Sequence, residues 1–246
     1  MPAKGHHWVG TSGWSYANWK GPFYPAGLKQ RDWLPHYAEH FRTVELNASF
    51  YRLPPEAMLK GWVERTLQGF VFAVKAWRRI THLQRLKDCE EPLRFFLERM
   101  ATLEPRAGPL LFQLPPRFPA DVGLLRDVLA LLPRGRRAAF EFRDPSWHDE
   151  ATYRALADAN AAFVPFELAK LTGPRVCTAD FVYVRLHGRE ARYRGLYDDD
   201  ALAGWADWLK GHMAEGRDAY VYFDNTDRAD DAPRNATRLA EMLAPP

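Results

Sequence analysis

The stretch Ala138-Ala-Phe-Glu-Phe-Arg-Asp-Pro-Ser-Trp147 decides the fold that this sequence predicts. Small and aromatic residues lie between an arginine-rich turn and a following proline, which is typical of a buried β-strand. Two charged residues, Glu141 and Arg143, stand two positions apart near its end. Because side chains alternate along a strand, the two share one face. A charged pair is costly to bury unless it is paired or serves a function.

Polar residues also end the other apolar segments of the chain. In two segments a polar pair shares one face, Glu45 with Asn47 and Arg185 with His187. Other segments end in a single polar residue, namely Lys75, Gln113 and Asp224. If these strands run parallel, their polar ends converge on one spot. The pattern therefore predicts a site at the carboxyl ends of the strands.

Eight strand-like segments alternate with helical patterns along the chain. Strands are predicted at 8–13, 43–47, 70–77, 109–114, 137–143, 162–166, 181–187 and 219–223. Helices are predicted at 28–40, 55–67, 91–103, 121–132, 149–160, 198–214 and 231–243. Such alternation indicates a parallel sheet with crossover helices, and 246 residues suit eight such units. The sequence therefore predicts an α/β protein, a closed (β/α)8 TIM barrel forming a single domain over residues 1–246.

Composition and missing motifs narrow the functional class. No Gly-x-Gly-x-x-Gly follows the first strand and no Gly-x-Ser-x-Gly is present, which argues against a dinucleotide-binding fold and a serine nucleophile. Cys89 and Cys177 make no disulfide framework and no metal-ligand spacing. Without a signal core or an apolar membrane span, we expect a cytoplasmic protein with no membrane partner. A formal charge of +3 suits an anionic ligand without requiring one, and the oligomeric state is left open.

The acids and the histidine at the strand ends indicate acid–base chemistry. Glu45 or Glu141 would be the general base, and His187 the acid or proton shuttle. The leading hypothesis is an enzyme that acts on a small anionic substrate, either a phosphorylated sugar or a nucleotide-derived compound. The residues do not decide among hydrolysis, isomerisation and lyase chemistry, so the assignment as an enzyme stays open.

Three cations at the same strand ends are expected to hold the anion: Lys75, Arg143 and Arg185. Arginine offers a planar fork of donors and lysine a point charge, and both suit phosphate or carboxylate groups. For Arg143 we favour anion binding over mere neutralisation of Glu141, because the other two cations can already pair the glutamates. Further residues expected to contact substrate are Ser12, Trp14, Tyr16, Asn47, Tyr51, Gln113, Trp147, Asp224 and Asn225.

Two alternatives stay open. In the first, a divalent metal held by Glu45, Glu141, His187 and Asp224 assists hydrolysis of nucleic acid or sugar. Three cationic side chains at the same place oppose a dication, so we expect no metal and no other cofactor. In the second, the protein binds a nucleotide or nucleic acid without catalysis through its aromatic and arginine-rich loops, although no binding motif supports this.

Short motifs distributed along the whole chain point to a known family. They are Gly10-Thr-Ser-Gly-Trp-Ser-Tyr16 with Trp19 and Phe23-Tyr-Pro25; Val44-Glu-Leu-Asn47 with Phe50-Tyr51 and Pro54; Leu111-Phe-Gln-Leu-Pro-Pro116; Glu141-Phe-Arg143 with Ser146-Trp147; Arg185-Leu-His-Gly188; and Tyr222-Phe-Asp-Asn225 with Asn235-Ala236. These motifs resemble the YecE-like family, also described as domain of unknown function 72. The resemblance implies a (β/α)8 barrel and carries no settled activity. One departure is that the last strand, which usually ends Phe-Asn-Asn in that family, ends Phe223-Asp-Asn225 here.

Overall fold

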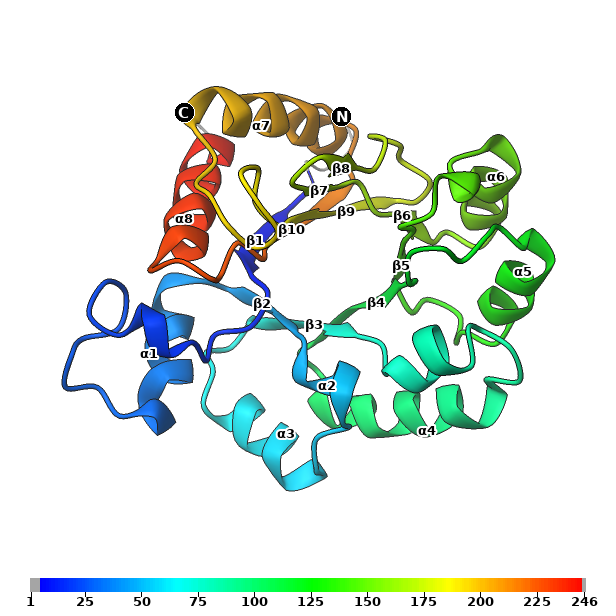
Figure 1. Ribbon diagram of the computed structural model, residues 1–246. Helices are drawn as coiled ribbons and strands as arrows, with labels where there is room; N and C mark the ends of the chain where they lie inside the picture. The colour runs from blue at the N-terminus through cyan, green and yellow to red at the C-terminus, as the bar shows by residue number, and fades with distance from the viewer. Residues whose placement is uncertain (1–4, 245–246) are drawn as a thin grey trace.

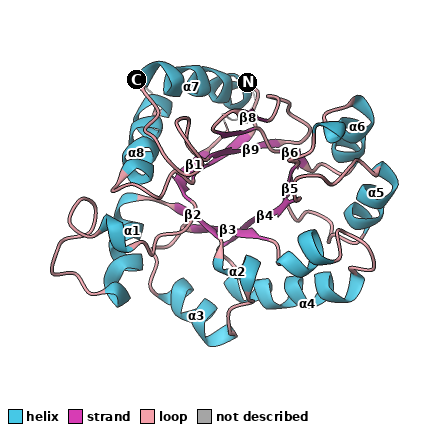
Figure 2. Cartoon of the chain, viewed as in Figure 1, coloured by secondary structure: helices cyan, strands magenta, loops and turns pink. Residues whose placement is uncertain are grey.

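The computed structural model describes residues 5–244. Its strands are β1 (His7–Thr11), β2 (Thr43–Leu46), β3 (Val71–Lys75), β4 (Ala107–Gln113), β5 (Ala138–Glu141), β6 (Ala162–Phe163), β7 (Phe166–Leu168), β8 (Leu171–Thr172), β9 (Phe181–Leu186) and β10 (Asp218–Phe223). Its α-helices are α1 (Trp33–His40), α2 (Ala48–Tyr51), α3 (Glu56–Glu64), α4 (Glu90–Met100), α5 (Val122–Ala130), α6 (Glu150–Asp158), α7 (Asp199–Ala214) and α8 (Asp231–Leu243). The strands lie around a common centre and the helices lie outside them (Figures 1 and 2).

Aspartate side chains fix where three of the helices begin. Asp121, Asp149 and Asp198 precede α5, α6 and α7, and each accepts a hydrogen bond from the backbone N–H three residues later, at 2.9, 2.8 and 2.8 Å. Such a cap satisfies one of the donors that the first turn leaves unpaired and contributes about 1 kcal/mol. The starts of these helices therefore follow from the local sequence.

The prediction of a closed (β/α)8 barrel is wrong. The strands form two separate five-stranded sheets, in the orders β1-β10-β9-β7-β8 and β2-β3-β4-β5-β6. The second sheet is parallel throughout, whereas the first is mixed because β7 pairs with β8 in antiparallel fashion. The sixth predicted strand, 162–166, is divided between β6 and β7. The residues that follow it, for which no strand was predicted, complete the β7–β8 hairpin.

The breaks between the sheets have local causes. β6 has only two residues, and Pro165, which has no N–H, lies between it and β7, so the ladder cannot continue. At the other junction, β1 and β2 are linked by one isolated bridge between Ser12 and Glu45. Gly10 permits this close approach, because a Cβ there would lie 2.4 Å from the carbonyl oxygen of Thr43.

The site is the polar end of a face that is otherwise apolar. Ala139 and Tyr183 belong to a buried hydrophobic cluster at the centre of the molecule. Two residues further along the same strands come Glu141 at the end of β5 and Arg185 in β9. Since side chains alternate, the inner face that is apolar in the middle of these strands becomes charged at their carboxyl ends.

Candidate functional site

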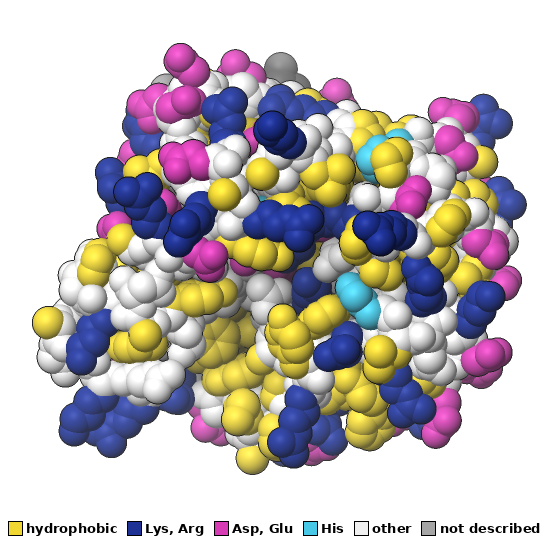
Figure 3. Space-filling model, viewed as in Figure 1, with side chains coloured by type: hydrophobic (Ala, Val, Ile, Leu, Met, Phe, Trp, Pro, Cys, Tyr) yellow, Lys and Arg dark blue, Asp and Glu magenta, His cyan; other side chains and the backbone are white. Residues whose placement is uncertain are grey.

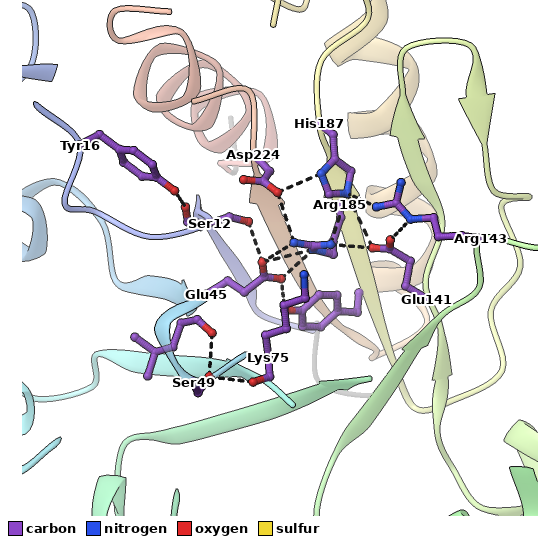
Figure 4. Close-up of polar contacts among 12 residues, drawn as sticks. Ser12, Tyr16, Glu45, Ser49, Lys75, Glu141, Arg143, Arg185, His187 and Asp224 are labelled. Atoms are coloured by element: carbon purple, nitrogen blue, oxygen red, sulfur yellow. Dashed lines mark hydrogen bonds and ion pairs between the residues drawn. The ribbon is translucent and has the colours of Figure 1, made fainter. Parts of the chain in front are cut away.

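A buried ion-pair network joins the two sheets at these strand ends (Figure 4). Arg185 holds Glu45 through two of its nitrogens, with Nη2 2.7 Å from Oε1 and Nε 2.9 Å from Oε2. Its Nη1 donates to Glu141 Oε2 at 2.8 Å. Both carboxylates are fully buried and Arg185 is 1% exposed. One guanidinium therefore bridges Glu45 and Glu141, the two residues predicted as alternative general bases.

His187 extends the network towards Asp224. Its Nδ1 lies 3.0 Å from Asp224 Oδ2, while its Nε2 faces Nη2 of Arg143 at 3.0 Å and Nη1 of Arg185 at 3.3 Å. A guanidinium can only donate, so Nε2 accepts and Nδ1 carries the proton that it donates to Asp224. The arrangement is that of a neutral imidazole oriented by a carboxylate.

Arg143 faces Glu141 rather than open space. Its Nε donates to Glu141 Oε1, and its guanidinium lies over the ring of Phe166 at 4.4 Å. The side chain is 8% exposed. Its charge is thus paired with Glu141 inside the network, and we favour neutralisation of Glu141 over the anion-binding role expected for Arg143.

Two hydroxyl groups complete the shell around Glu45. Ser12 Oγ donates to Oε1 at 2.7 Å and Tyr183 OH donates to Oε2 at 2.7 Å. Sequence reasoning missed Tyr183, although it lies on the same strand face as Arg185 and His187, and that alternation could have identified it.

Glu141 and Asp224 are held in their charged form. Burial alone would raise the pKa of Glu141, but Arg143 and Arg185 hold it well below its ordinary value of 4.5. Burial likewise opposes the charged form of Asp224, yet the hydrogen bond from His187 and the nearby cations lower its pKa. Conversely, the carboxylates outweigh burial at Arg185 and raise its pKa. These acids are ionised at neutral pH.

A pocket of about 280 Å³ lies beside the network, between loops that follow several strands. It is lined by Tyr16, Asn47, Phe50, Tyr51, Lys75, Tyr193, Asp224, Thr226 and Asp227. Lysine and arginine side chains gather over the middle of this face of the molecule, beside a hollow (Figure 3). Four lining residues were not among the predicted contacts, because they lie in segments after the strands whose course the strand pattern does not fix: Phe50 in α2, and Tyr193, Thr226 and Asp227 in loops.

Lys75 is the cation of this pocket. Within residues 5–244 it forms no salt bridge, and its Nζ lies 4.5 Å from the centre of the Phe50 ring. Burial, and then the charge of Arg185, lower its pKa to about 8. At neutral pH the amine is thus mostly charged, and Glu45, Glu141 and Asp224 favour this form from beyond salt-bridge distance.

A second pocket of about 410 Å³ adjoins the first, since Tyr16 and Asn47 line both. Trp14 lines this second pocket and packs edge-on against Trp62, with ring centres 5.1 Å apart. Asn47 Oδ1 is buried and accepts no hydrogen bond from any residue in 5–244. An unpaired acceptor is costly to bury, so this oxygen suits a donor group of a ligand.

Three of the predicted contact residues lie apart from the network and from both pockets. Trp147 is fully buried, stacks on Phe142 with ring centres 4.7 Å apart, and donates to the carbonyl of Phe118 at 2.7 Å. Gln113 donates to the carbonyl of Leu114, and Asn225 donates to the carbonyl of Gly195. Their contacts stabilise packing and loops, and we propose no substrate contact for them.

The metal alternative at the strand ends loses support from the same geometry. Arg185 contacts Glu45, Glu141 and Asp224, and it therefore occupies the space between the proposed ligands. In residues 5–244 these acids and His187 do not form a cluster whose donor atoms are close enough to share an ion. We therefore do not place a metal there.

The fold and the site together define an α/β protein whose charged residues gather at the carboxyl ends of its parallel strands. The family model described as "Protein of unknown function DUF72" matches residues 8–246, and the chain belongs to this family. The expected resemblance to the YecE-like family is confirmed by two curated relatives. UPF0759 protein YunF of Bacillus subtilis (strain 168) is 27% identical over 275 residues, covering 96% of this chain and 94% of the relative. UPF0759 protein YecE of Escherichia coli (strain K12) is 34% identical over 142 residues, covering 57% of this chain and 49% of the relative.

Solved structures of the same family are similar over nearly the whole chain. A DUF72 family protein from Thermotoga maritima MSB8 is 32% identical with a TM-score of 0.88, covering 97% of this chain and 99% of the other. A DUF72 family protein from Enterococcus faecalis V583 is 22% identical with a TM-score of 0.82, which supports the fold alone. The names of these proteins state no substrate or reaction. In residues 5–244, none of the helices has the length and apolar character needed to cross a membrane.

Proposed function

We propose that the protein is an enzyme that acts on a small anionic substrate by acid–base chemistry, with the pocket at Lys75 as its active site. The observation that carries the proposal is the unpaired charge of Lys75. Arg143 and Arg185 are neutralised inside the network, whereas Lys75 lines the pocket without a salt bridge to any described residue. A charged amine in this position suits a phosphate or carboxylate group.

The size of the pocket favours a small substrate. Ligand pockets usually have volumes of about 300–1,000 Å³, and the pocket at Lys75 has about 280 Å³. A phosphorylated sugar fits this volume better than a nucleotide-derived compound does. Asn47 Oδ1 would accept a hydrogen bond from a sugar hydroxyl, and the exposed ring of Tyr51 offers an apolar face.

Asp224 is the acid–base group that the geometry supports best. It lines the pocket, it is held ionised, and it accepts a hydrogen bond from Nδ1–H of His187. Glu45 and Glu141 are fully buried beneath Arg185 and do not line the pocket. We therefore assign proton abstraction to Asp224, with His187 orienting it, and a positioning role to the two glutamates.

Binding of phosphate compounds tests the proposal. We would titrate the full chain and the Lys75→Met variant with inorganic phosphate and with triose, tetrose and pentose phosphates by calorimetry. We expect the variant to bind at least tenfold more weakly, while Lys210→Met, at an exposed position of α7, binds like the parent. Equal affinity of the Lys75 variant would overturn the proposal.

Turnover of the bound compounds tests the catalytic part. We would follow each phosphate ester that binds by NMR in water and in deuterium oxide. Asp224→Asn should retain binding and lose conversion or isotope exchange, because the amide cannot take up the proton. A compound that binds at Lys75 yet is never altered by the parent protein would contradict the assignment as an enzyme.

A further inference from the structure

A separate group of metal-ligating side chains lies at the end of α1, and none of them lines the pocket at Lys75. His36, Glu39 and His40 are spaced i, i+3 and i+4, so they project from one face of the helix. One donor atom of each lies within 4.8 Å of the donor atoms of the other two. Within residues 5–244, no other three histidine, cysteine or acidic side chains bring their donor atoms this close together.

The spacing of the donors matches two ligands that share an ion. His36 Nδ1 and Glu39 Oε2 are 3.6 Å apart, which is too long for a strong hydrogen bond. Zn²⁺ binds imidazole nitrogen and carboxylate oxygen at about 2.0–2.2 Å, so two ligands at a tetrahedral angle stand about 3.4 Å apart. A small adjustment of the exposed Glu39 side chain, which is 67% exposed, would reach that separation.

Both imidazoles are already oriented by their surroundings. Nδ1 of His40 lies 2.9 Å from the carbonyl oxygen of His36 and donates to it, which leaves Nε2 of His40 with a free lone pair. Phe23 packs edge-on against both rings, with ring centres 5.6 Å from His36 and 5.3 Å from His40. A backbone acceptor on one nitrogen and packing against the ring are the usual means of orienting a ligating histidine.

The surroundings of His36 direct its Nδ1, and not its Nε2, towards Glu39. The imidazole is 20% exposed, and its Nε2 is buried without a hydrogen-bond partner. Coordination through Nδ1 would place the proton on Nε2 and would give Nδ1 a stronger partner than the long contact to Glu39. Since His40 and Glu39 are exposed, an ion can enter from solvent.

We propose that His36, Glu39 and His40 bind a divalent transition-metal ion such as Zn²⁺. Two imidazoles and a carboxylate are a donor set that Zn²⁺, Cu²⁺ and Ni²⁺ accept, whereas Mg²⁺ and Ca²⁺ prefer oxygen ligands alone. Three protein ligands leave a coordination position for water. The residue order His-x-x-Glu-His is also found in zinc-dependent peptidases, but these side chains line neither the pocket at Lys75 nor the pocket beside it, and we infer binding alone.

Metal titration of the full chain without an added histidine tag tests this site. We would measure Zn²⁺ binding by calorimetry and Co²⁺ binding by visible absorption, which reports the coordination geometry. We expect one ion per chain. His40→Gln and Glu39→Gln, both at exposed positions that should not disturb folding, should weaken binding, His40→Gln by at least tenfold. His148→Gln and His212→Gln are matched controls on other elements and should bind like the parent.

The other histidines near the start of the chain provide the decisive comparison. His6 and His7 are adjacent and form an independent source of imidazole ligands. The double variant His6→Gln and His7→Gln should retain the one-ion stoichiometry and the Co²⁺ spectrum. Loss of binding in that variant, or unchanged binding in His40→Gln, would overturn the proposal, and so would the absence of binding by the parent chain.

Discussion

Nη2 and Nε of Arg185 contact the two carboxylate oxygens of Glu45 at 2.7 and 2.9 Å. Glu45 comes from β2 in one sheet and Arg185 from β9 in the other. The pair therefore links two sheets whose backbone ladders are not continuous with each other. Because both side chains are buried, water cannot replace the ionic partner if one of the two is removed.

Loss of Arg185 should strongly destabilise the fold. Arg185→Met leaves Glu45 buried without its cation and weakens the pairing of Glu141, and breaking a buried pair costs about 3–5 kcal/mol. We expect this loss in the free energy of unfolding measured with urea at pH 7. Arg94→Met is the matched control, since Arg94 pairs with Glu98 on the exposed face of α4 and such pairs contribute about 0.3–0.5 kcal/mol. A loss below about 1 kcal/mol for Arg185→Met would show that the network does not join the sheets.

Glu141 should make the protein sensitive to acid. Its pKa in the folded chain lies well below the ordinary value of 4.5, because Arg143 and Arg185 outweigh the effect of burial. The unfolded chain therefore takes up the proton first, and stability present above pH 4.5 is lost as the pH falls towards the folded value. Urea unfolding between pH 7 and pH 3 measures this slope.

The contribution of Glu141 can be isolated by substitution. Glu141→Gln should be less stable than the parent at pH 7, and the difference should narrow below pH 4.5 because the unfolded parent chain then takes up a proton at Glu141 that the folded chain does not. Glu98→Gln, at an exposed position of α4, should leave the profile of the parent unchanged. Parallel profiles of parent and Glu141→Gln would contradict the pairing seen in the structure.

Gly10 should be required where the two sheets meet. In Gly10→Ala the new Cβ would lie 2.4 Å from the carbonyl oxygen of Thr43, which is backbone and cannot move aside without shifting β2. We expect a loss of about 1–3 kcal/mol in the free energy of unfolding, the range for overpacking a close contact. Gly61→Ala in α3 has nothing within 4 Å of the new methyl and should be neutral or stabilising by up to about 1 kcal/mol. Equal effects of the two substitutions would contradict the close approach of β1 and β2.

The sequence predicted the strand ends well because alternation along a strand is a local property. Glu45, Glu141, Arg185, His187 and Asp224 were expected together, and the structure brings their side chains into one network. Closure of the sheet was predicted wrongly, because it depends on how many residues each strand adds to its ladder. The two-residue strand β6 ends that ladder before Pro165.

The direction of side chains outside the strands was beyond the sequence pattern. Trp147 was expected at a ligand, but Phe142 and Phe118 provide an apolar surface that buries it completely. The pairing of Arg143 with Glu141 depends on a rotamer that no spacing reveals. The His36-x-x-x-His40 spacing is a metal-ligand signal that the sequence does contain, and it was overlooked.

Lys75 should give two pH dependences of opposite sign. Its pKa in the folded chain is lowered to about 8, chiefly by burial, from an ordinary value of 10.5. Below pH 8 the folded protein bears the full cost of the buried charge. Between pH 8 and pH 10.5 the unfolded chain binds more protons, so this cost is relieved and stability rises with pH. Lys75→Met should therefore be more stable than the parent at pH 7, and the difference should shrink as the pH approaches 10.5.

Anion binding should change in the other direction over the same range. As the pH rises above about 8, Lys75 loses the positive charge that we propose binds the anion. The affinity for phosphate compounds should then fall about tenfold per pH unit. The deprotonation of Lys75 does not lower the stability of the folded protein over the same range. Calorimetry at pH 7, 8 and 9 with a dianionic sugar phosphate measures the first effect, and urea unfolding of parent and Lys75→Met measures the second. Affinity that stays constant from pH 7 to pH 9 would separate the anion from Lys75, because no other group of the pocket is expected to hold it.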